Sequence, residues 1–384
     1  MSKIPDSFIE ELKAKTSLVR YVKQYTLLRE VGLGIWQGAC PHPDHDDSTP
    51  SFTVWEKTNS WACYGCHTGK KGLDGNLGSD IYAFIQWIEG VNFVKAVHIL
   101  AEWNNVPVPT DQNQKEYDRN YRLASKYQKD LLETEPHLLE YLYERGFDDC
   151  DIEQWMIGYD KATDRIVFPL LDTYKNVIGF NKRVVDKEYH GGDKYKNSVN
   201  SKIFNKSSYL YGIHLLDHSY REIRITEGSI DVALAKKYGV KNVVATLGTA
   251  FTEQHAKVIS RMGLTPVLIF DGDEAGNKGL YKALAYFESL GVYCKIVRLP
   301  QGKDLADIAS ELKFGTENFL RRNSMTAGFL HVKDIIDEYN NSLYQLRIET
   351  IPKLEEVLKL VPKTEKRYIK SFIKDELNIS IDEQ

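Results

Sequence analysis

Four residues near the start of the chain have the side chains and the spacing of a metal site. They are Cys40, His45, Cys63 and Cys66, in the pattern Cys-x4-His-x17-Cys-x2-Cys. Three thiolates and one imidazole suit tetrahedral Zn²⁺, and four protein ligands leave no open position for water. The sequence therefore predicts one structural zinc ion. His42 and His67 are alternatives to His45 as the histidine ligand.

Acidic residues in the second half of the chain form another group that could bind metal. They are Glu227, Asp231, Asp271, Asp273, Asp304 and Asp307. Glu227 and the Asp271–Asp273 pair follow two predicted parallel strands at their carboxyl ends, where open α/β sheets bind ligands. Neighbouring carboxylates repel each other unless a cation neutralises them, and oxygen ligands favour Mg²⁺ or Mn²⁺. We therefore predict a second metal site, which would be catalytic.

Helix capping is the alternative explanation for part of this acidic group. Aspartate is a favoured residue at the start of a helix, and Asp231, Glu274 and Asp307 fit that role as well as they fit metal binding. Capping is a poor explanation for Glu227, Asp271 and Asp273 taken together. These acids follow two separate strands, as expected for ligands that share one site.

The segments that would position the acids alternate between strand and helix patterns. Strands are predicted at 223–226, 243–246, 266–270 and 295–299, and helices at 230–238, 253–262 and 279–290. This order is typical of a parallel α/β sheet. After residue 309 the pattern is mainly helical.

The segments around the cysteines predict a small antiparallel domain between helices. Apolar residues three or four positions apart predict helices within 5–22 and 81–100, and short alternating runs predict strands at 51–55 and 61–63. Five of the six tryptophans lie in this part of the chain. Aromatic residues of a small domain usually pack in its core, so we expect core packing here in preference to base stacking on the surface.

Charge separates the middle of the chain from the rest. Residues 161–211 carry ten Lys and Arg against five Asp and Glu, a net charge of +5, which leaves −9 for the remainder of a chain whose total is −4. This indicates one basic surface on an acidic body. The same region predicts a helix at 117–144 and strands at 165–171 and 177–185.

Composition excludes several classes of protein. With 384 residues, 42% hydrophobic and 27% charged, the chain fits a folded protein of two or three domains. No apolar run approaches the roughly 18 residues of a membrane span, and no secretory signal opens the sequence, so we expect a cytoplasmic protein without a membrane partner. The chain lacks a Gly-x4-Gly-Lys-[Ser/Thr] loop, which argues against a P-loop ATPase or a fused helicase motor.

The cysteine pattern is one of several motifs in the first hundred residues. The others are Ile-Pro-x-x-Phe-Ile-x-x-Leu at 4–12 and Thr-Pro-Ser-Phe-Thr-Val at 49–54, with Cys-Tyr-Gly-Cys at 63–66. Together they resemble the zinc-binding domain of DnaG-type primases from bacteria and phages. That family usually has Cys-x2-His, so this chain has a two-residue insertion. The distance from His45 to the 49–54 run matches the family, and the resemblance therefore favours His45 over His42.

Further motifs extend the resemblance over nearly the whole chain. They are Tyr-Leu-x-x-Arg-Gly at 141–146, Val-Ile-Gly-Phe at 177–180, Lys-Tyr-x-Asn-Ser at 194–198, Phe-x-Lys at 204–206 and Leu-Tyr-Gly at 210–212. These are similar to motifs of the primase polymerase core. The segment 227–273 resembles the TOPRIM module that primases share with topoisomerases.

The resemblance implies roles for individual residues. The catalytic, metal-binding acids would be Glu227, Asp271 and Asp273, with Asp231 and Asp304 as accessory magnesium ligands. The residues that would bind the template or the incoming nucleotide are Arg145, Arg183, Lys194, Asn197 and Lys206. The last acidic pair of the family is normally Asp-x-Asp, so Asp307, one position farther on, is not assigned a role.

The function implied by the resemblance is that of a DNA primase, an RNA polymerase that makes short RNA primers on single-stranded DNA. Its substrates would be ribonucleoside triphosphates, its cofactors structural Zn²⁺ and catalytic Mg²⁺ or Mn²⁺, and its partner a replicative helicase. Cellular relatives add a helicase-binding domain after the last helical segment seen here. We therefore expect this chain to dock on a helicase by another surface or to work without that contact.

The expected architecture is multidomain, combining α/β and α+β parts. The domains are a zinc-binding domain at 1–106, a linker at 107–116, the basic N-terminal part of the polymerase core at 117–220, a TOPRIM domain at 221–310 and a C-terminal helical subdomain at 311–384.

Two other functions share some of these features. One is a TOPRIM nuclease or topoisomerase, which cuts DNA; a type I topoisomerase would need a nucleophilic tyrosine on large additional domains, for which 384 residues leave little room. The other is a non-catalytic, zinc-dependent DNA-binding protein, which would not need acids on separate strands.

Overall fold

A computed structural model describes most of the chain. The described residues are 4–47, 49–69, 80–109, 111–134, 136–185, 195–217, 219–248, 250–341, 350–361, 363–377 and 381. They form two compact units. The N-terminal unit comprises Met1–Leu139, Met156–Tyr209 and Lys257–Gly263, and the C-terminal unit comprises Glu140–Trp155, Leu210–Ala256 and Leu264–Gln384. In the described part of the chain, every helix is too short or too polar to cross a lipid bilayer.

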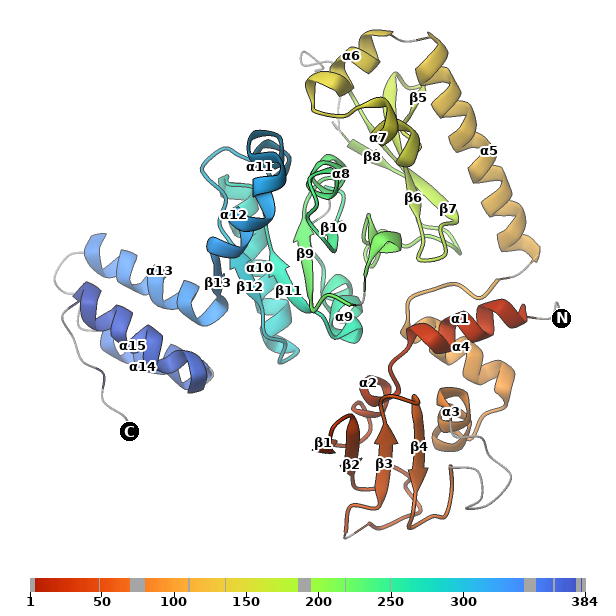
Figure 1. The fold of residues 1–384 in the computed structure, drawn as a ribbon, viewed down its shortest axis with the longest axis vertical. Coiled ribbons are helices and arrows are strands. Elements are labelled where there is room, and N and C mark those ends of the chain that lie inside the picture. The colour runs from red at the N-terminus through yellow and green to blue at the C-terminus, as the bar shows by residue number, and fades with distance from the viewer. Residues whose placement is uncertain are drawn as a thin grey trace. The chain divides into compact units, whose positions relative to one another are not determined.

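The first part of the N-terminal unit is a small antiparallel sheet with helices (Figure 1). Its elements are α1 (Asp6–Lys15), α2 (Leu18–Val22), β1 (Arg29–Gly32), β2 (Ile35–Gly38), β3 (Phe52–Trp55), β4 (Ser60–Cys63), α3 (Ile81–Glu89) and α4 (Phe93–Trp103). The strands pair in the order β1-β2-β3-β4, all antiparallel. Phe52 and Trp61 stack within the buried core, as predicted for aromatic residues here, and Phe84 packs edge-on against both.

The rest of the N-terminal unit pairs a long helix with a second sheet. Its elements are α5 (Asp111–Thr134), β5 (Gly158–Asp160), β6 (Arg165–Leu171), β7 (Val177–Arg183) and β8 (Tyr195–Asn197). The strands pair in the order β5-β6-β7-β8, again antiparallel. Ala124 of α5 is buried against Val167, Val177 and Phe180. Helix α5 begins at Asp111, inside the stretch that the sequence suggested as a linker.

The C-terminal unit contains the predicted α/β sheet (Figure 1). Its strands are β9 (Glu222–Thr226), β10 (Val243–Ala245), β11 (Thr265–Leu268), β12 (Lys295–Val297) and β13 (Ser324–Thr326). The order is β10-β9-β11-β12-β13, and the first four strands are parallel. The predicted α/β fold is therefore confirmed. Strand β13, which pairs antiparallel with β12, was not predicted, because the sequence there appeared helical.

The remaining elements of the C-terminal unit are helices. They are α6 (Pro136–Glu144), whose first residues belong to the other unit, α7 (Asp149–Gln154), α8 (Ser229–Lys237), α9 (Glu253–Met262), whose residues from Lys257 on belong to the other unit, α10 (Glu274–Ser289), α11 (Leu305–Leu312), α12 (Thr316–Arg322), α13 (Ala327–Asn341), α14 (Thr350–Leu360) and α15 (Lys363–Leu377), with single 3₁₀ turns at Ile213–Leu215 and Lys313–Gly315. Helices α13 to α15 share a core of their own that includes Val332, Leu354 and Ile373. This agrees with the mainly helical pattern expected after residue 309.

Candidate metal centres and catalytic site

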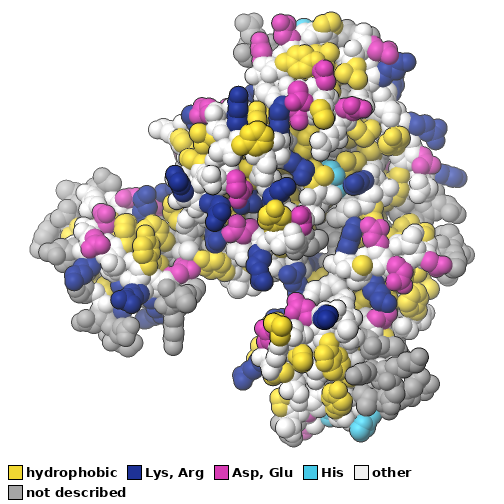
Figure 2. Space-filling view, viewed as in Figure 1, with side chains coloured by type: hydrophobic (Ala, Val, Ile, Leu, Met, Phe, Trp, Pro, Cys, Tyr) yellow, Lys and Arg dark blue, Asp and Glu magenta, His cyan; other side chains and the backbone are white. Residues whose placement is uncertain are grey.

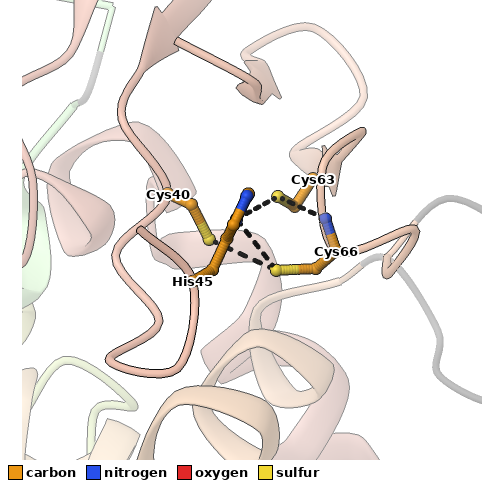
Figure 3. Close-up of side chains that lie close together, drawn as sticks. All are labelled: Cys40, His45, Cys63 and Cys66. Atoms are coloured by element: carbon orange, nitrogen blue, oxygen red, sulfur yellow. Dashed lines mark hydrogen bonds between the residues drawn. The ribbon is translucent and has the colours of Figure 1, made fainter. Parts of the chain in front are cut away.

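The four predicted zinc ligands lie together in the structure. The ligand atoms of Cys40, His45, Cys63 and Cys66 are all within 4.8 Å of one another. Figure 3 shows their side chains directed at one space, from the loop before β3 and from the turn that follows β4. Sγ of Cys66 is 3.1 Å from Nδ1 of His45 and 3.6 Å from Sγ of Cys40. A tetrahedron with metal–ligand bonds of about 2.0–2.3 Å has edges of about 3.3–3.8 Å, so the residues fit Zn²⁺.

His45 is the histidine of this cluster among the described residues. His42 instead stacks on Trp87, with ring centroids 4.8 Å apart and an angle of 28° between the planes. His67 has a left-handed backbone (φ 56°) just after Cys66 and is not part of the cluster. The geometry therefore agrees with the choice of His45 that the motif spacing favoured.

Hydrogen bonds from neighbouring residues hold the cysteine-bearing loops in place. Asp47 Oδ2 accepts from the backbone N–H of Cys40 at 2.7 Å and from the backbone N–H and hydroxyl of Ser51 at 3.0 and 2.8 Å. Only a glycine at position 65 lets the His45 ring pack against the backbone of this turn, because a Cβ there would lie 2.1 Å from Cε1 of His45. The sequence did not identify Asp47 as a supporting residue, since its role depends on the path of the loop.

The thiol groups need a cation in order to ionise together. Burial raises the pKa of the Cys40 thiol well above its ordinary value and raises that of Cys66 to about 11. Burial also opposes ionisation of Cys63, but hydrogen bonds from Ser51 and from the Cys66 backbone outweigh it, and the pKa of Cys63 is lowered. A bound Zn²⁺ would supply the charge that stabilises the other thiolates.

Glu227 and Asp271 meet at the carboxyl edge of the α/β sheet. Glu227 follows β9 and Asp271 follows its neighbour β11, and the backbone N–H of Asp271 donates to Oε1 of Glu227 at 3.3 Å. The following loop folds tightly, since a Cβ at Gly272 would lie 2.0 Å from the carbonyl oxygen of Pro300. The predicted convergence of acids from separate strands is therefore present.

The acids at this edge of the sheet lie close enough to repel one another, so a cation there would stabilise their ionised forms. Burial raises the pKa of Asp271 to about 8, and the carboxylates of Asp231, Glu227, Asp304 and Asp273 add to the rise. Burial also raises the pKa of Glu227. Oδ1 of Asp271 is buried without a hydrogen-bond partner. These acids are nevertheless more widely spaced than the zinc ligands, which form the one group within 4.8 Å in the described part of the chain.

Asp231 occupies a different position from the acids around it. It is buried, and its two oxygens accept from Thr226 Oγ1 at 3.1 Å, Gly228 N at 2.9 Å and Ala306 N at 3.1 Å. Burial, with the nearby Asp304 carboxylate, raises its pKa to about 7. Asp231 thus joins the starts of α8 and α11, and its oxygens are already used as hydrogen-bond acceptors.

Three more acids of the group begin helices. Asp273 is the N-cap of α10 and accepts from Gly276 N at 2.7 Å. Asp304 is the N-cap of α11, in a capping box with Asp307. Burial raises the pKa of Asp304, and the positive charge of Arg145 opposes that rise. The capping explanation is therefore correct for Asp307 and for Asp231, which accepts from the backbone N–H of the N-cap residue of α8. Asp273 and Asp304 are N-caps too, so the expectation that capping explains Asp273 poorly was wrong.

The residues predicted to bind template or nucleotide are in both units. Arg145 lies in the C-terminal unit, near Asp304. In the N-terminal unit, Nη1 of the buried Arg183 donates to Tyr195 Oη at 2.8 Å, and Oδ1 of Asn197 accepts from Asn181 at 2.8 Å. Lys206 is half-buried, and Lys194 lies outside the described residues.

Basic side chains also occur on the C-terminal unit. The last turns of α8 and α12 carry Lys236, Lys237, Arg321 and Arg322. Figure 2 shows Lys and Arg side chains gathered over the region of α8, α11 and α12 on the face in view. The charge sums along the sequence did not predict this concentration.

Three sequence families match the parts of this architecture. The family described as CHC2 zinc finger matches residues 4–116, that described as DNA primase catalytic core, N-terminal domain, matches 159–217, and that described as Toprim-like matches 224–309. These matches define a protein with a zinc ribbon, a primase core and a TOPRIM sheet.

Known proteins agree with this class. The chain is 31% identical to a DNA primase of Staphylococcus aureus strain MSSA476, over 83% of this chain and 59% of that protein. It therefore spans less than two thirds of that relative. Over most of its length the chain is similar to DnaG-type primases.

Solved structures show the same fold. The zinc-binding and RNA polymerase domains of the Aquifex aeolicus primase match with a TM-score of 0.56 at 23% identity, covering 99% of this chain and 98% of that one. A DnaG primase catalytic domain bound to single-stranded DNA matches with a TM-score of 0.57 at 23% identity, covering 70% of this chain and 98% of that one.

Proposed function

We propose that this protein is a DNA primase that makes short RNA primers on single-stranded DNA by metal-assisted nucleotidyl transfer. The observation that carries the proposal is the contact between Glu227 and Asp271 from neighbouring parallel strands, beside an Asp271 oxygen without a partner. The similarity to DNA primases supports the same activity. Ribonucleoside triphosphates and a single-stranded DNA template are the proposed substrates, and a replicative helicase is a proposed partner.

The reaction joins a 3′-hydroxyl to the α-phosphate of a nucleoside triphosphate and releases pyrophosphate, so positioning and charge dominate its barrier. Mg²⁺ or Mn²⁺, when bound, would neutralise charge on the phosphates and make the hydroxyl more acidic. Glu227, Asp271 and Asp273 are the proposed ligands, with Asp304 as an accessory one. The raised pKa of Glu227 makes its carboxylate a stronger base than an ordinary glutamate, which suits it to accept the hydroxyl proton.

Other residues would position these groups. Asp231 fixes the starts of α8 and α11 through its three hydrogen bonds, and we propose that this holds Glu227 and Asp304 in place. Arg145, beside Asp304, is a proposed phosphate contact on the C-terminal unit. Arg183, Lys194, Asn197 and Lys206 are proposed to bind the template or the nucleotide from the N-terminal unit.

The zinc cluster would have a structural role in a domain that contributes to template recognition. We propose the boundaries 1–106 for this domain, 107–116 for a connecting segment, 117–220 for the N-terminal part of the core, 221–310 for the TOPRIM domain and 311–384 for the helical subdomain. The family matches at 159–217 and 224–309 support the boundary between the core and the TOPRIM domain, whereas the match at 4–116 includes the proposed connecting segment.

The decisive test is synthesis by a variant with both Asp271→Asn and Asp273→Asn. Labelled ribonucleotides, a single-stranded template and Mg²⁺ are incubated with the protein, and the products are separated on a denaturing gel. We expect the double variant to lose primer synthesis and to keep single-stranded DNA binding, measured by fluorescence anisotropy. Asp375→Asn, an exposed acid on α15, is the matched control. Synthesis at the wild-type rate by the double variant would disprove the metal assignment.

DNA cleavage is the alternative reaction for acids on a TOPRIM sheet. Supercoiled plasmid incubated with the wild-type protein, Mg²⁺ and ribonucleotides separates the two reactions. Nicked or relaxed plasmid without any RNA product would favour the nuclease or topoisomerase alternative, and neither product would favour a non-catalytic DNA-binding protein.

A further inference from the structure

A cavity of about 780 Å³ opens beside the aspartates that follow β11. Its walls come from the loop at 271–273, the first two turns of α10 and the residues at the end of β12 and just after it. Ligand sites commonly have volumes of roughly 300–1,000 Å³. The cavity is therefore large enough for a phosphate-bearing ligand, and it adjoins two of the proposed metal ligands.

Arg298 is one of the residues that line this cavity. Its Nη2 atom donates to Tyr281 Oη at 2.5 Å and to Asp334 Oδ1 at 2.9 Å. Within the described residues these bonds use Nη2 alone, and Nε is buried without a hydrogen-bond partner. A guanidinium group has five N–H donors. Arg298 therefore has more donors than the surrounding protein uses.

Lys278, four residues after Glu274 on α10, also lines the cavity. Their ion pair is 2.6 Å long, but both side chains are highly exposed, at 76% and 85%. Exposed pairs of this kind contribute little to stability, so the lysine can turn to another anion at small cost. The amide of Gln301 lines the same cavity.

Asp271 lines the same cavity, and its Oδ1 atom is buried without a hydrogen-bond partner. The lining therefore includes a guanidinium group with unused donors and a carboxyl group without a positive partner. A phosphate chain that shares a divalent cation with Asp271 would satisfy both groups, because its oxygens accept from the guanidinium while the cation meets the carboxylate. An uncharged nucleoside would leave the carboxylate unmet.

We propose that this cavity binds the phosphate chain of a nucleoside triphosphate or of the pyrophosphate released from it, with Arg298 as the principal phosphate-binding residue and Lys278 as a second contact. The inference rests on the proposed nucleotidyl transfer and names the place of its phosphates on the C-terminal unit. Arg298 in this role is a binding residue, since it would contact the substrate or product directly.

The test is isothermal titration calorimetry of the full chain with inorganic pyrophosphate, with ATP and with adenosine, all in Mg²⁺. Arg298→Met should weaken pyrophosphate binding about tenfold, as expected for the loss of a charge-assisted hydrogen bond. Arg322→Met removes the same charge from the exposed end of α12, outside the cavity, and should bind as the wild type does. Adenosine should bind much more weakly than ATP. Unchanged pyrophosphate affinity in Arg298→Met would overturn the proposal.

A second variant separates binding from packing. Asp334→Asn removes the ion pair with Arg298 but keeps the guanidinium, so pyrophosphate binding should be retained or strengthened. If Asp334→Asn weakens binding as much as Arg298→Met does, Arg298 is only structural and the proposal is wrong. A loss confined to pyrophosphate assigns the cavity to the product, and a loss for ATP as well assigns it to the substrate tail.

Primer synthesis by the wild type is measured separately on the denaturing gel. If the wild type makes primers and Arg298→Met binds pyrophosphate normally, only the cavity assignment fails. If the wild type makes no primers yet shows Arg298-dependent pyrophosphate binding, the proposed function fails while the cavity remains a phosphate site.

Discussion

Replacing Asp271 with asparagine should stabilise the metal-free protein while it destroys the proposed activity. Burial, together with Asp231, Glu227, Asp304 and Asp273, raises the pKa of Asp271 from 3.8 to about 8. The folded protein therefore binds this proton more tightly than the unfolded chain does between pH 3.8 and about 8. Across that interval the carboxyl group makes the metal-free protein less stable as the pH rises.

The size of the effect follows from the width of that interval. Each pKa unit corresponds to about 1.36 kcal/mol, and pH 7 lies about three units above the ordinary pKa, which gives an upper bound of about 4 kcal/mol. Asp271 is partly exposed, and solvent screening reduces the expected gain for Asp271→Asn to about 1–2 kcal/mol. For a protein of 384 residues that is a rise in Tm of roughly 1–3 °C.

The assay is thermal unfolding of the wild type, Asp271→Asn and the control Asp375→Asn in EDTA, between pH 5 and pH 8. The gain in Tm for Asp271→Asn should grow with pH. Adding Mg²⁺ should raise the Tm of the wild type and of the control more than that of Asp271→Asn. A variant less stable than the wild type in EDTA at pH 7.5 would refute the argument from clustered carboxylates, and so would a gain that does not change with pH.

The remaining predictions concern the zinc cluster and the buried aspartate. Cys63→Ser should lose zinc in a metal-content assay, whereas Cys150→Ser, at an exposed thiol, should keep it. Gly65→Ala should lose zinc faster to a chelator, because its Cβ would lie 2.1 Å from His45, and an unchanged rate would contradict the close packing. Asp231→Asn should cost about 1–3 kcal/mol in urea unfolding, since its amide group would face backbone or hydroxyl donors.

The zinc cluster was the part of the molecule that the sequence predicted best. Its ligands come from two short loops, and the Cys-x2-Cys turn fixes the distance between two of them. The choice between His45 and His42 needed either the family spacing or the structure, because both histidines lie in the same loop. The role of Asp47 was not predictable, since it depends on where the backbone N–H groups of Cys40 and Ser51 point.

The acidic edge was predictable for a different reason. In a parallel sheet, acids that directly follow two neighbouring strands must share an edge, so Glu227 and Asp271 could be placed together from pattern alone. The hydrogen bond from Ala306 to Asp231 could not be predicted from the sequence, because it joins residues 75 positions apart. The same holds for Arg298 and Asp334, whose contact depends on how α13 packs beside β12.

The two sites differ in how closely their ligands are grouped. Hydrogen bonds from outside the cluster hold the zinc-binding loops, and the four ligand atoms lie within 4.8 Å of one another. At the sheet edge Glu227, Asp273 and Asp304 each accept from a backbone N–H, and the mutual repulsion of the acids opposes closer approach. Asp273 and Asp304 also begin α10 and α11, so a cation that draws them inward would act on both helices through their first turns. Since α10 also forms a wall of the cavity that contains Arg298, binding of a cation and binding of a phosphate chain should reinforce each other.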